Sequence, residues 1–171
     1  MLTPDELIKL LDVTGYDYDF HEHNALFTVE ESNKLRGEIK GLHSKNLFLK
    51  NKKNKFFLFS CEEFSKIKLK TISKSLDLGN VSFAKKEYLL ELLGISPGSV
   101  TPFALLNNIE NNIDFYLEDK MLESEYINFH PLTNKVTVTI KSREFIEFMI
   151  ENKKKIHIFS TSNGTIVKTY G

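Results

Sequence analysis

Helical spacing of apolar residues begins almost at the start of the chain. Thr3, Pro4 and Glu6 form an N-cap, a first-turn proline and a capping box, and leucines then recur at helical spacing to about Val13. Gly15 is placed to end this helix. The same reasoning predicts helices at 28–35, opened by a capping box at Thr28–Glu31, at 69–76, at 86–93 with a stop at Gly94, and from Ser142, as N-cap, to about Met149.

Period-two alternation and short apolar runs predict about eight strands. Residues 16–23 alternate, and two runs at 47–50 and 55–60 flank a charged tip, which is the pattern of a β-hairpin. Further strands are expected at 81–84, 113–117, 126–130, 136–140, 156–159 and 165–168. Strands that alternate with helices and also meet in hairpins predict an α+β fold with a mixed sheet. We expect one domain over residues 1–171, ending in a hairpin at 155–171.

Composition narrows the classes of protein that fit. A chain of 171 residues can bury enough surface to fold as one domain without metal or disulfides. The single cysteine, Cys61, excludes a disulfide framework and a multi-cysteine metal cluster. The sequence has no run of 18 apolar residues and no basic, apolar leader at Met1. We therefore expect a cytoplasmic protein with no membrane segment.

Charge is balanced overall but segregated along the chain. The 23 basic and 23 acidic residues cancel, yet residues 34–86 carry a net charge of +10 and residues 1–33 a net charge of −7. The densest basic run ends at the tip of the expected hairpin, with Lys50, Lys52, Lys53 and Lys55. Phosphate contacts with a polyanion such as tRNA are one interpretation. The other is a solvated hairpin that maintains solubility.

The histidines suggest few local sites. His21 and His23 share one face of an expected strand and could bind a metal, but no third ligand is evident, which favours two ordinary polar residues. His43 could contact phosphate or solvent, and His157 has no local partner and is interpreted as structural. His130, followed by Pro131, stands at the end of a strand, where sites are often built; the alternative is a hydrogen bond that caps the strand end.

Two further segments could supply chemistry. In the loop Gly98–Pro102, glycine allows successive N–H groups to converge on an anion, and Pro97 and Pro102 would stiffen the loop. The same loop could be a plain connection. Lys45 could grip a phosphate or carbonyl, with Asn46 as donor and acceptor, or Lys45 could guard a strand edge against aggregation.

Four segments occur in one order and together resemble the YbaK/ProX family, the stand-alone relatives of the editing domain of bacterial prolyl-tRNA synthetases. They are Phe27–Glu31, Lys45–Leu49, Leu93–Phe103 and Phe129–Pro131. The resemblance covers roughly residues 3–150. Within the family, the sequence is similar to the branch called PrdX or ProXp-ala. It implies a mixed, strongly curved sheet flanked by helices, and hydrolysis of a mischarged amino acid from tRNA.

The resemblance also implies roles for individual residues. The catalytic set implied is Lys45, Gly98, Ser99 and His130. The substrate-binding set is Phe27, Thr28, Val29, Asn46, Val100, Thr101 and Pro102, and the hairpin lysines Lys50, Lys52, Lys53 and Lys55 would contact tRNA. We hypothesise that backbone N–H groups of residues 98–101 hold the oxyanion formed during hydrolysis.

The implied substrate is tRNA for proline carrying alanine. Cysteine or another small amino acid is an alternative, because one methylene is worth only about 1–3 kcal/mol of discrimination. A non-catalytic tRNA-binding module is a second alternative. We expect a monomer that needs no metal or other cofactor, with prolyl-tRNA synthetase as a candidate partner.

Overall fold

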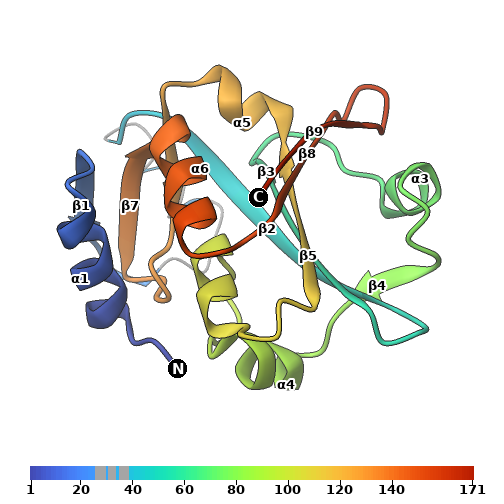
Figure 1. Cartoon of the computed structure of the whole chain (residues 1–171), viewed down its shortest axis with the longest axis horizontal. Helices are drawn as coiled ribbons and strands as arrows, with labels where there is room; N and C mark the ends of the chain where they lie inside the picture. The colour runs from blue at the N-terminus through green and yellow to red at the C-terminus, as the bar shows by residue number, and fades with distance from the viewer. Residues whose placement is uncertain (26–29, 31–33, 35–38) are drawn as a thin grey trace.

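The protein is built on one mixed sheet with helices packed around it (Figure 1). The structure, a computed structural model, describes residues 1–25, 30, 34 and 39–171. The strands are β1 (Tyr18–Glu22), β2 (Leu42–Asn51), β3 (Phe56–Glu62), β4 (Val81–Phe83), β5 (Ile113–Glu118), β6 (Tyr126–Phe129), β7 (Val136–Lys141), β8 (Ile156–Phe159) and β9 (Ile166–Tyr170).

Helices cover the sheet from several sides. They are α1 (Pro4–Thr14), α3 (Leu69–Ser75), α4 (Lys86–Tyr88) continuing into the π-helical η1 (Leu89–Leu93), the 3₁₀-helical η2 (Pro102–Asn107), α5 (Asp119–Glu123) and α6 (Ser142–Glu151). In Figure 1, α6 crosses in front of the long strand β2, while α1 and α3 lie at opposite ends of the molecule. No helix in the described ranges is long and apolar enough to cross a membrane.

The strand order is β1-β7-β6-β2-β3-β5-β8-β9, with β4 added to β2. Pairs β2–β3, β6–β7, β1–β7 and β8–β9 are antiparallel, whereas β2–β6, β3–β5 and β5–β8 are parallel. The sheet is therefore mixed, as the sequence predicts. The predicted hairpins around residues 51–54 and 160–165 are both present, and the second closes the chain as β8–β9.

Local signals explain several elements. Thr3 accepts a hydrogen bond from the Glu6 amide (3.2 Å) while the Glu6 carboxylate accepts one from the Thr3 amide (2.8 Å), so the predicted capping box is confirmed. Gly15 ends α1 with φ of 75°. The prediction that Ser142 caps α6 is wrong: Lys141 occupies the N-cap position, and the Ser142 hydroxyl donates to the Ser124 carbonyl instead.

Other elements differ from the sequence prediction. The helix expected at 86–93 is present but changes to π-helical hydrogen bonding in its second half. Neither η2 nor α5 is predicted, because runs of six and five residues are too short to show a helical period. The helix expected at 28–35 lies largely outside the described residues.

Two clusters of buried side chains occupy opposite faces of the central strands. The larger, here the main core, includes Phe48, Leu58 and Phe115, and α6 and η2 pack on it. The smaller, the second core, includes Leu49, Phe59 and Tyr116, with Ile72 of α3. Because successive residues of a strand point to opposite faces, even positions of β2 face the main core and odd positions face the second core.

Candidate functional site

The strand β2 leaves its neighbour β6 after a short pairing. The two β2–β6 pairs are Leu42↔Ile127 and His43↔Asn128. Further along the same edge of β2, the strand β4 pairs with it from Leu49 onward. Between these points, that edge of β2 has no partner among the described strands. Extending the parallel register by two residues brings His130 level with Lys45. We call this region, where the backbones of β2 and β6 diverge, the split.

The loop before η2 is anchored beside the split. Pro102 starts η2, and the Phe103 ring packs edge-on against Phe129, the last residue of β6, with 6.0 Å between ring centroids. Val100 also packs against the main core. The loop 98–102 is thus anchored to the end of β6 on the main-core face, whereas Lys45, which pairs with Cys61, lies on the second-core face.

The backbone of this loop is set by a glycine and by turn hydrogen bonds. Gly98 has φ of 87°, a conformation that favours glycine. The Ser99 amide donates to the Ser96 carbonyl (3.1 Å), so this N–H is already used within the turn. The amides of Gly98, Val100 and Thr101 donate to no other described residue. Three of the four predicted oxyanion donors are therefore free of competing partners in this part of the structure.

Lys45 and Asn46 point to opposite faces of the sheet, because they are consecutive on β2. Lys45 lies opposite Cys61 on the second-core face, and its ammonium donates to the Ser65 carbonyl. An ammonium has three N–H groups, so this bond leaves two. The sequence treats Lys45 and Asn46 as one motif, but the structure separates their side chains.

Ser65 and Glu118 support Lys45 and are not identifiable from sequence patterns. The fully buried Glu118 carboxylate accepts from the Ser65 hydroxyl (2.7 Å) and from the Glu62 amide (3.0 Å). Ser65 in turn provides the carbonyl that holds the Lys45 ammonium. Only the folded sheet brings these residues together, since Glu118 is 53 positions from Ser65.

On the opposite face, Asn46 belongs to a chain of hydrogen bonds. Its carbonyl oxygen accepts from the Ser60 hydroxyl (2.5 Å), and its amide nitrogen donates to Ser44 Oγ (3.3 Å). Ser44 Oγ donates to the Asn128 carbonyl on β6 (2.9 Å), which ties the two strands together at the base of the split. Asn46 retains one N–H for a ligand.

His130 is held in one orientation. Its Nδ1 lies 2.8 Å from the Val136 carbonyl; because a carbonyl only accepts, Nδ1 carries the proton, and in the neutral ring Nε2 is an acceptor. Burial lowers the pKa of His130, and the neighbouring His23 lowers it further, despite the bond to Val136. The lowered pKa favours the neutral ring.

His23 is a neighbour of His130 that sequence reasoning missed. The two ring centroids are 6.1 Å apart, and His23 Nε2 lies 2.9 Å from the Thr137 hydroxyl. In the sequence, the alternation that places His21 and His23 on one strand face suggests a metal site. It gives no indication that His23 lies next to His130. No group of three or more His, Cys, Asp or Glu with metal-binding geometry occurs in the described part of the chain.

The four hairpin lysines are placed differently from one another. Lys50 lies over the Tyr88 ring, 5.2 Å from its centroid, and Lys55 pairs with Asp114 (2.8 Å). Lys52 and Lys53 are exposed at the tip. Asn51 shapes this tip, because its side-chain oxygen accepts from the amides of Lys53 and Lys55.

One further side chain and one predicted segment complete the description of the site. Cys61 is fully buried, and burial raises the pKa of its thiol, so it provides no nucleophile. The segment Phe27, Thr28 and Val29, predicted to bind substrate, lies outside the described residues.

Comparison with known proteins assigns the chain to a known family. The sequence profile of the "Aminoacyl-tRNA editing domain" matches residues 23–148. The chain is 38% identical over 133 residues to prolyl-tRNA synthetase associated domain-containing protein 1 of Xenopus laevis, covering 75% of this chain and 79% of that one. It is 29% identical over 146 residues to the prolyl-tRNA editing protein ProX of Acetoanaerobium sticklandii, covering 85% and 88%.

A solved structure shares the fold. It is the crystal structure of a proposed trans-editing enzyme for prolyl tRNA synthetase, with a TM-score of 0.67 at 18% identity, covering 91% of this chain and 96% of that one. At this identity the similarity concerns the fold alone. It confirms the predicted α+β architecture.

Proposed function

Because the chain belongs to the aminoacyl-tRNA editing domain family, the YbaK/ProX family that its motifs resemble, we propose that it is a deacylase. Its substrate in this proposal is tRNA for proline that carries a wrong, small amino acid. The observation that carries the proposal is the loop 98–101, in which Gly98 has φ of 87° and the amides of Gly98, Val100 and Thr101 donate to no other described residue.

The proposed reaction is ester hydrolysis. The oxygen of a water molecule attacks the ester carbonyl carbon, and the bond from that carbon to the ribose oxygen breaks. One water proton passes to the leaving ribose oxygen, so the products are the free amino acid and a tRNA with an intact 3′ end. The neighbouring ribose hydroxyl can carry this proton, which explains why a strong general base is not required in the site.

Negative charge develops on the carbonyl oxygen during the attack. The amides of Gly98, Val100 and Thr101 are suited to stabilise it, since the turn at Ser99 and the packing of Phe103 on Phe129 hold them in place. Preorganised donors of this kind are typically worth about 100- to 1,000-fold in rate each. The buried Ser99 is assigned a role in shaping this turn.

The remaining residues are assigned to positioning. The neutral Nε2 of His130 accepts a hydrogen bond from the water or from the substrate amine, and Asn46 donates its remaining N–H to the ester or amine. Lys45, held by Ser65, uses its other N–H groups on the terminal adenosine or its phosphate. Val100, Pro102 and the segment Phe27–Val29 are the proposed pocket walls.

The proposed amino acid is alanine, and no metal or other cofactor enters the reaction. Cysteine is the nearest alternative, since it differs from alanine by one sulfur atom. The names of two relatives link them to prolyl-tRNA synthetase or prolyl-tRNA, which makes this synthetase the proposed partner. We place the activity in the cytoplasm, where charged tRNA occurs, and propose that one copy of the domain suffices.

A panel of substrates tests the function. Purified protein at catalytic concentration is incubated with tRNA for proline carrying alanine, cysteine, serine or proline, and the released amino acid is measured. We expect many turnovers on the alanyl ester and at least tenfold slower release from the prolyl ester. Tight binding of every substrate without release would contradict hydrolysis and favour the non-catalytic tRNA-binding module.

A further inference from the structure

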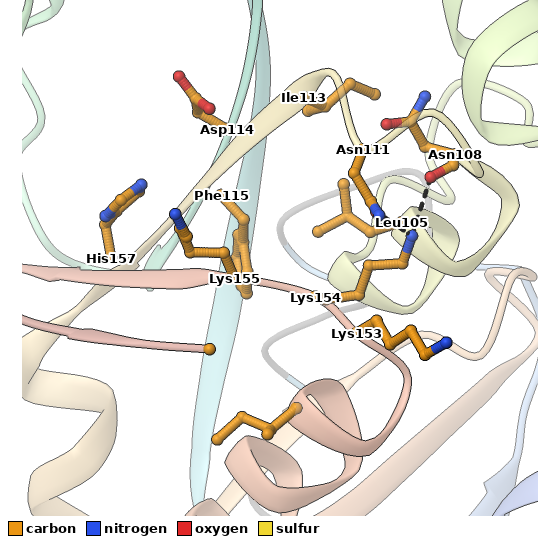
Figure 2. Close-up of a pocket in the computed structure, with 12 residues that line it drawn as sticks. Leu105, Asn108, Asn111, Ile113, Asp114, Phe115, Lys153, Lys154, Lys155 and His157 are labelled. Carbon is orange, nitrogen blue, oxygen red and sulfur yellow. Dashed lines mark hydrogen bonds between the residues drawn. The ribbon is translucent and has the colours of Figure 1, made fainter.

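A basic cavity lies away from the split, at the hairpin end of the sheet. It has a volume of about 540 Å³ and lies between the start of β5, the connection from α6 to β8, and η2 (Figure 2). It is lined by Leu105, Asn108, Asn111, Ile113, Asp114, Phe115, Ile150, Lys153, Lys154, Lys155, His157 and Gly171. Six of these lie beyond residues 23–148, so the family match assigns them no role.

The three consecutive lysines of this cavity differ in burial and in their contacts. Lys154 is buried, and its ammonium donates to the Asn108 carbonyl (2.8 Å) and to Asn111 Oδ1 (2.5 Å), which closes one wall. Lys153 and Lys155 are exposed, and within the described ranges neither pairs with a carboxylate. Figure 2 shows these two side chains on either side of Lys154, with the Lys155 ammonium directed toward His157 and the Lys153 ammonium directed away from it. They are therefore available to an anion.

The acidic side chain of this cavity is already paired. Among the described residues that line it, Asp114 is the only one with a side-chain carboxylate, and Lys55 of the hairpin pairs with it at 2.8 Å. His157 lies beside Tyr116, with 5.1 Å between ring centroids; burial lowers its pKa, Asp114 opposes this shift, and Lys155 and Lys55 add to it. The His157 Nδ1 lies 3.0 Å from the Thr169 hydroxyl; when Nδ1 accepts from that hydroxyl, the Nε2–H group of the neutral ring is left to donate.

The cavity is related to Lys45 by the register of the sheet. Lys45 pairs with Cys61, while Phe57 of the same strand pairs with Asp114. Paired residues share a face and alternate residues repeat it, so Lys45 and Asp114 lie on one face of the sheet. From Lys45 to Lys50, where the hairpin meets the cavity, β2 extends about 17 Å at about 3.3 Å per residue.

The distance between Lys45 and the cavity indicates which class of ligand could occupy the cavity. A small ester bound at the split does not reach the cavity, whereas an RNA strand carries a phosphate at every nucleotide. The helix α3 on the same face adds exposed lysines, namely Lys70 and Lys74, with Lys66 and Lys68 just before it. We propose that the cavity holds a backbone phosphate of the tRNA, bound by Lys155 with His157 as a donor, while Lys153 adds positive charge on the other side of Lys154 (Figure 2). This inference rests on the proposed function.

The test measures tRNA binding and hydrolysis separately. Affinity for tRNA for proline is measured at several salt concentrations for wild type, for K153A/K155A, and for the control K9A/K120A, which removes two exposed lysines from α1 and α5. Each lost phosphate contact lowers the slope of log affinity against log salt by about one. We expect a lower slope and weaker binding only in K153A/K155A. An unchanged slope would overturn the phosphate site.

Hydrolysis of the alanyl ester of adenosine is followed in parallel, because this substrate has no RNA backbone. We expect K153A/K155A to hydrolyse it as fast as wild type; a loss equal to that on tRNA would overturn the inference. If wild type does not hydrolyse any ester, the proposed function fails while the binding result still decides the phosphate site.

Nuclear magnetic resonance of the His157 ring identifies the ligand class. An acceptor-stem RNA hairpin is expected to shift its signals and raise its pKa, and K153A/K155A is expected to abolish the shift. Inorganic phosphate should produce the same shift at much higher concentration. A shift that adenosine monophosphate saturates at lower concentration than the RNA hairpin would identify a free-nucleotide site and overturn the proposal.

Discussion

At the scale of single residues, the proposed chemistry depends on backbone and side-chain groups that the structure keeps available. Gly98 adopts a left-handed conformation, and the amides on either side of Ser99 have no described partner. His130 is fixed through Nδ1 and leaves Nε2 open. Both residues can be changed without removing a side chain from the main core.

Replacing Gly98 by valine tests the loop. A β-branched residue at φ of 87° costs about 1–2 kcal/mol and moves the neighbouring amides. We expect Gly98→Val to lower the rate of alanine release by about 100-fold or more.

Gly15→Val provides the matched control. Gly15 has φ of 75° at the end of α1, and a Cβ there would meet nothing within 4 Å. This variant should lose similar stability and keep its activity. Equal activity of the two variants would contradict the role assigned to the loop.

The partly buried His130 predicts a pH dependence of stability. Because burial lowers its folded pKa below the ordinary value of about 6.5, the unfolded chain binds more protons between these two values. His130 therefore stabilises the fold fully above pH 6.5, and this contribution is lost as the pH falls through the folded pKa.

Asparagine at position 130 keeps a donor for the Val136 carbonyl but does not titrate. Chemical unfolding of wild type and His130→Asn between pH 8 and pH 4.5 should show the steeper loss in wild type. His157 is present in both proteins, so the difference reports His130. Parallel curves would show that the His130 pKa is not lowered.

At the scale of elements, the hairpin β2–β3 joins the proposed catalytic and RNA-binding regions. Its strands carry Lys45 at one end and the lysine tip at the other, and Asn51 fixes the geometry of that tip. Lys50 and Lys55 are engaged with Tyr88 and Asp114, which leaves the tip lysines as the most available cations of the hairpin.

Removal of the tip charges should weaken tRNA binding without affecting the fold. Lys52 and Lys53 are exposed, so K52A/K53A is expected to change stability by less than about 0.5 kcal/mol. The slope of log affinity against log salt should fall by about two, one unit per lost phosphate contact. K52R/K53R retains both charges and should behave as wild type, whereas an unchanged slope in the alanine variant would assign the tip to solubility alone.

At the scale of the whole molecule, the sequence predicts the fold class and most strands because caps, alternation and turn residues are local signals. The capping box at Thr3 and the hairpin at Asn51–Asn54 are examples. It does not predict the split, since the point where β2 leaves β6 depends on pairing between residues 85 positions apart.

The same limit applies to the candidate site. Lys45, Asn46 and His130 stand out by residue type and by resemblance, but the support of Lys45 by Ser65 and Glu118 involves residues that have no motif. The opposite directions of Lys45 and Asn46 follow from strand alternation once β2 is known to extend through both. Distances across the sheet, not spacing along the chain, determine which groups can act together.

The most direct test of the account is the steady-state release of alanine from alanyl-tRNA for proline by wild type and Lys45→Ala. Lys40→Ala is the control, because it removes a nearby lysine that pairs with Asp19 at the surface. We predict multiple turnovers by wild type and Lys40→Ala, and a loss of about 100-fold or more in Lys45→Ala with an unchanged circular dichroism spectrum. Full activity of Lys45→Ala, or no turnover by wild type, would contradict the account.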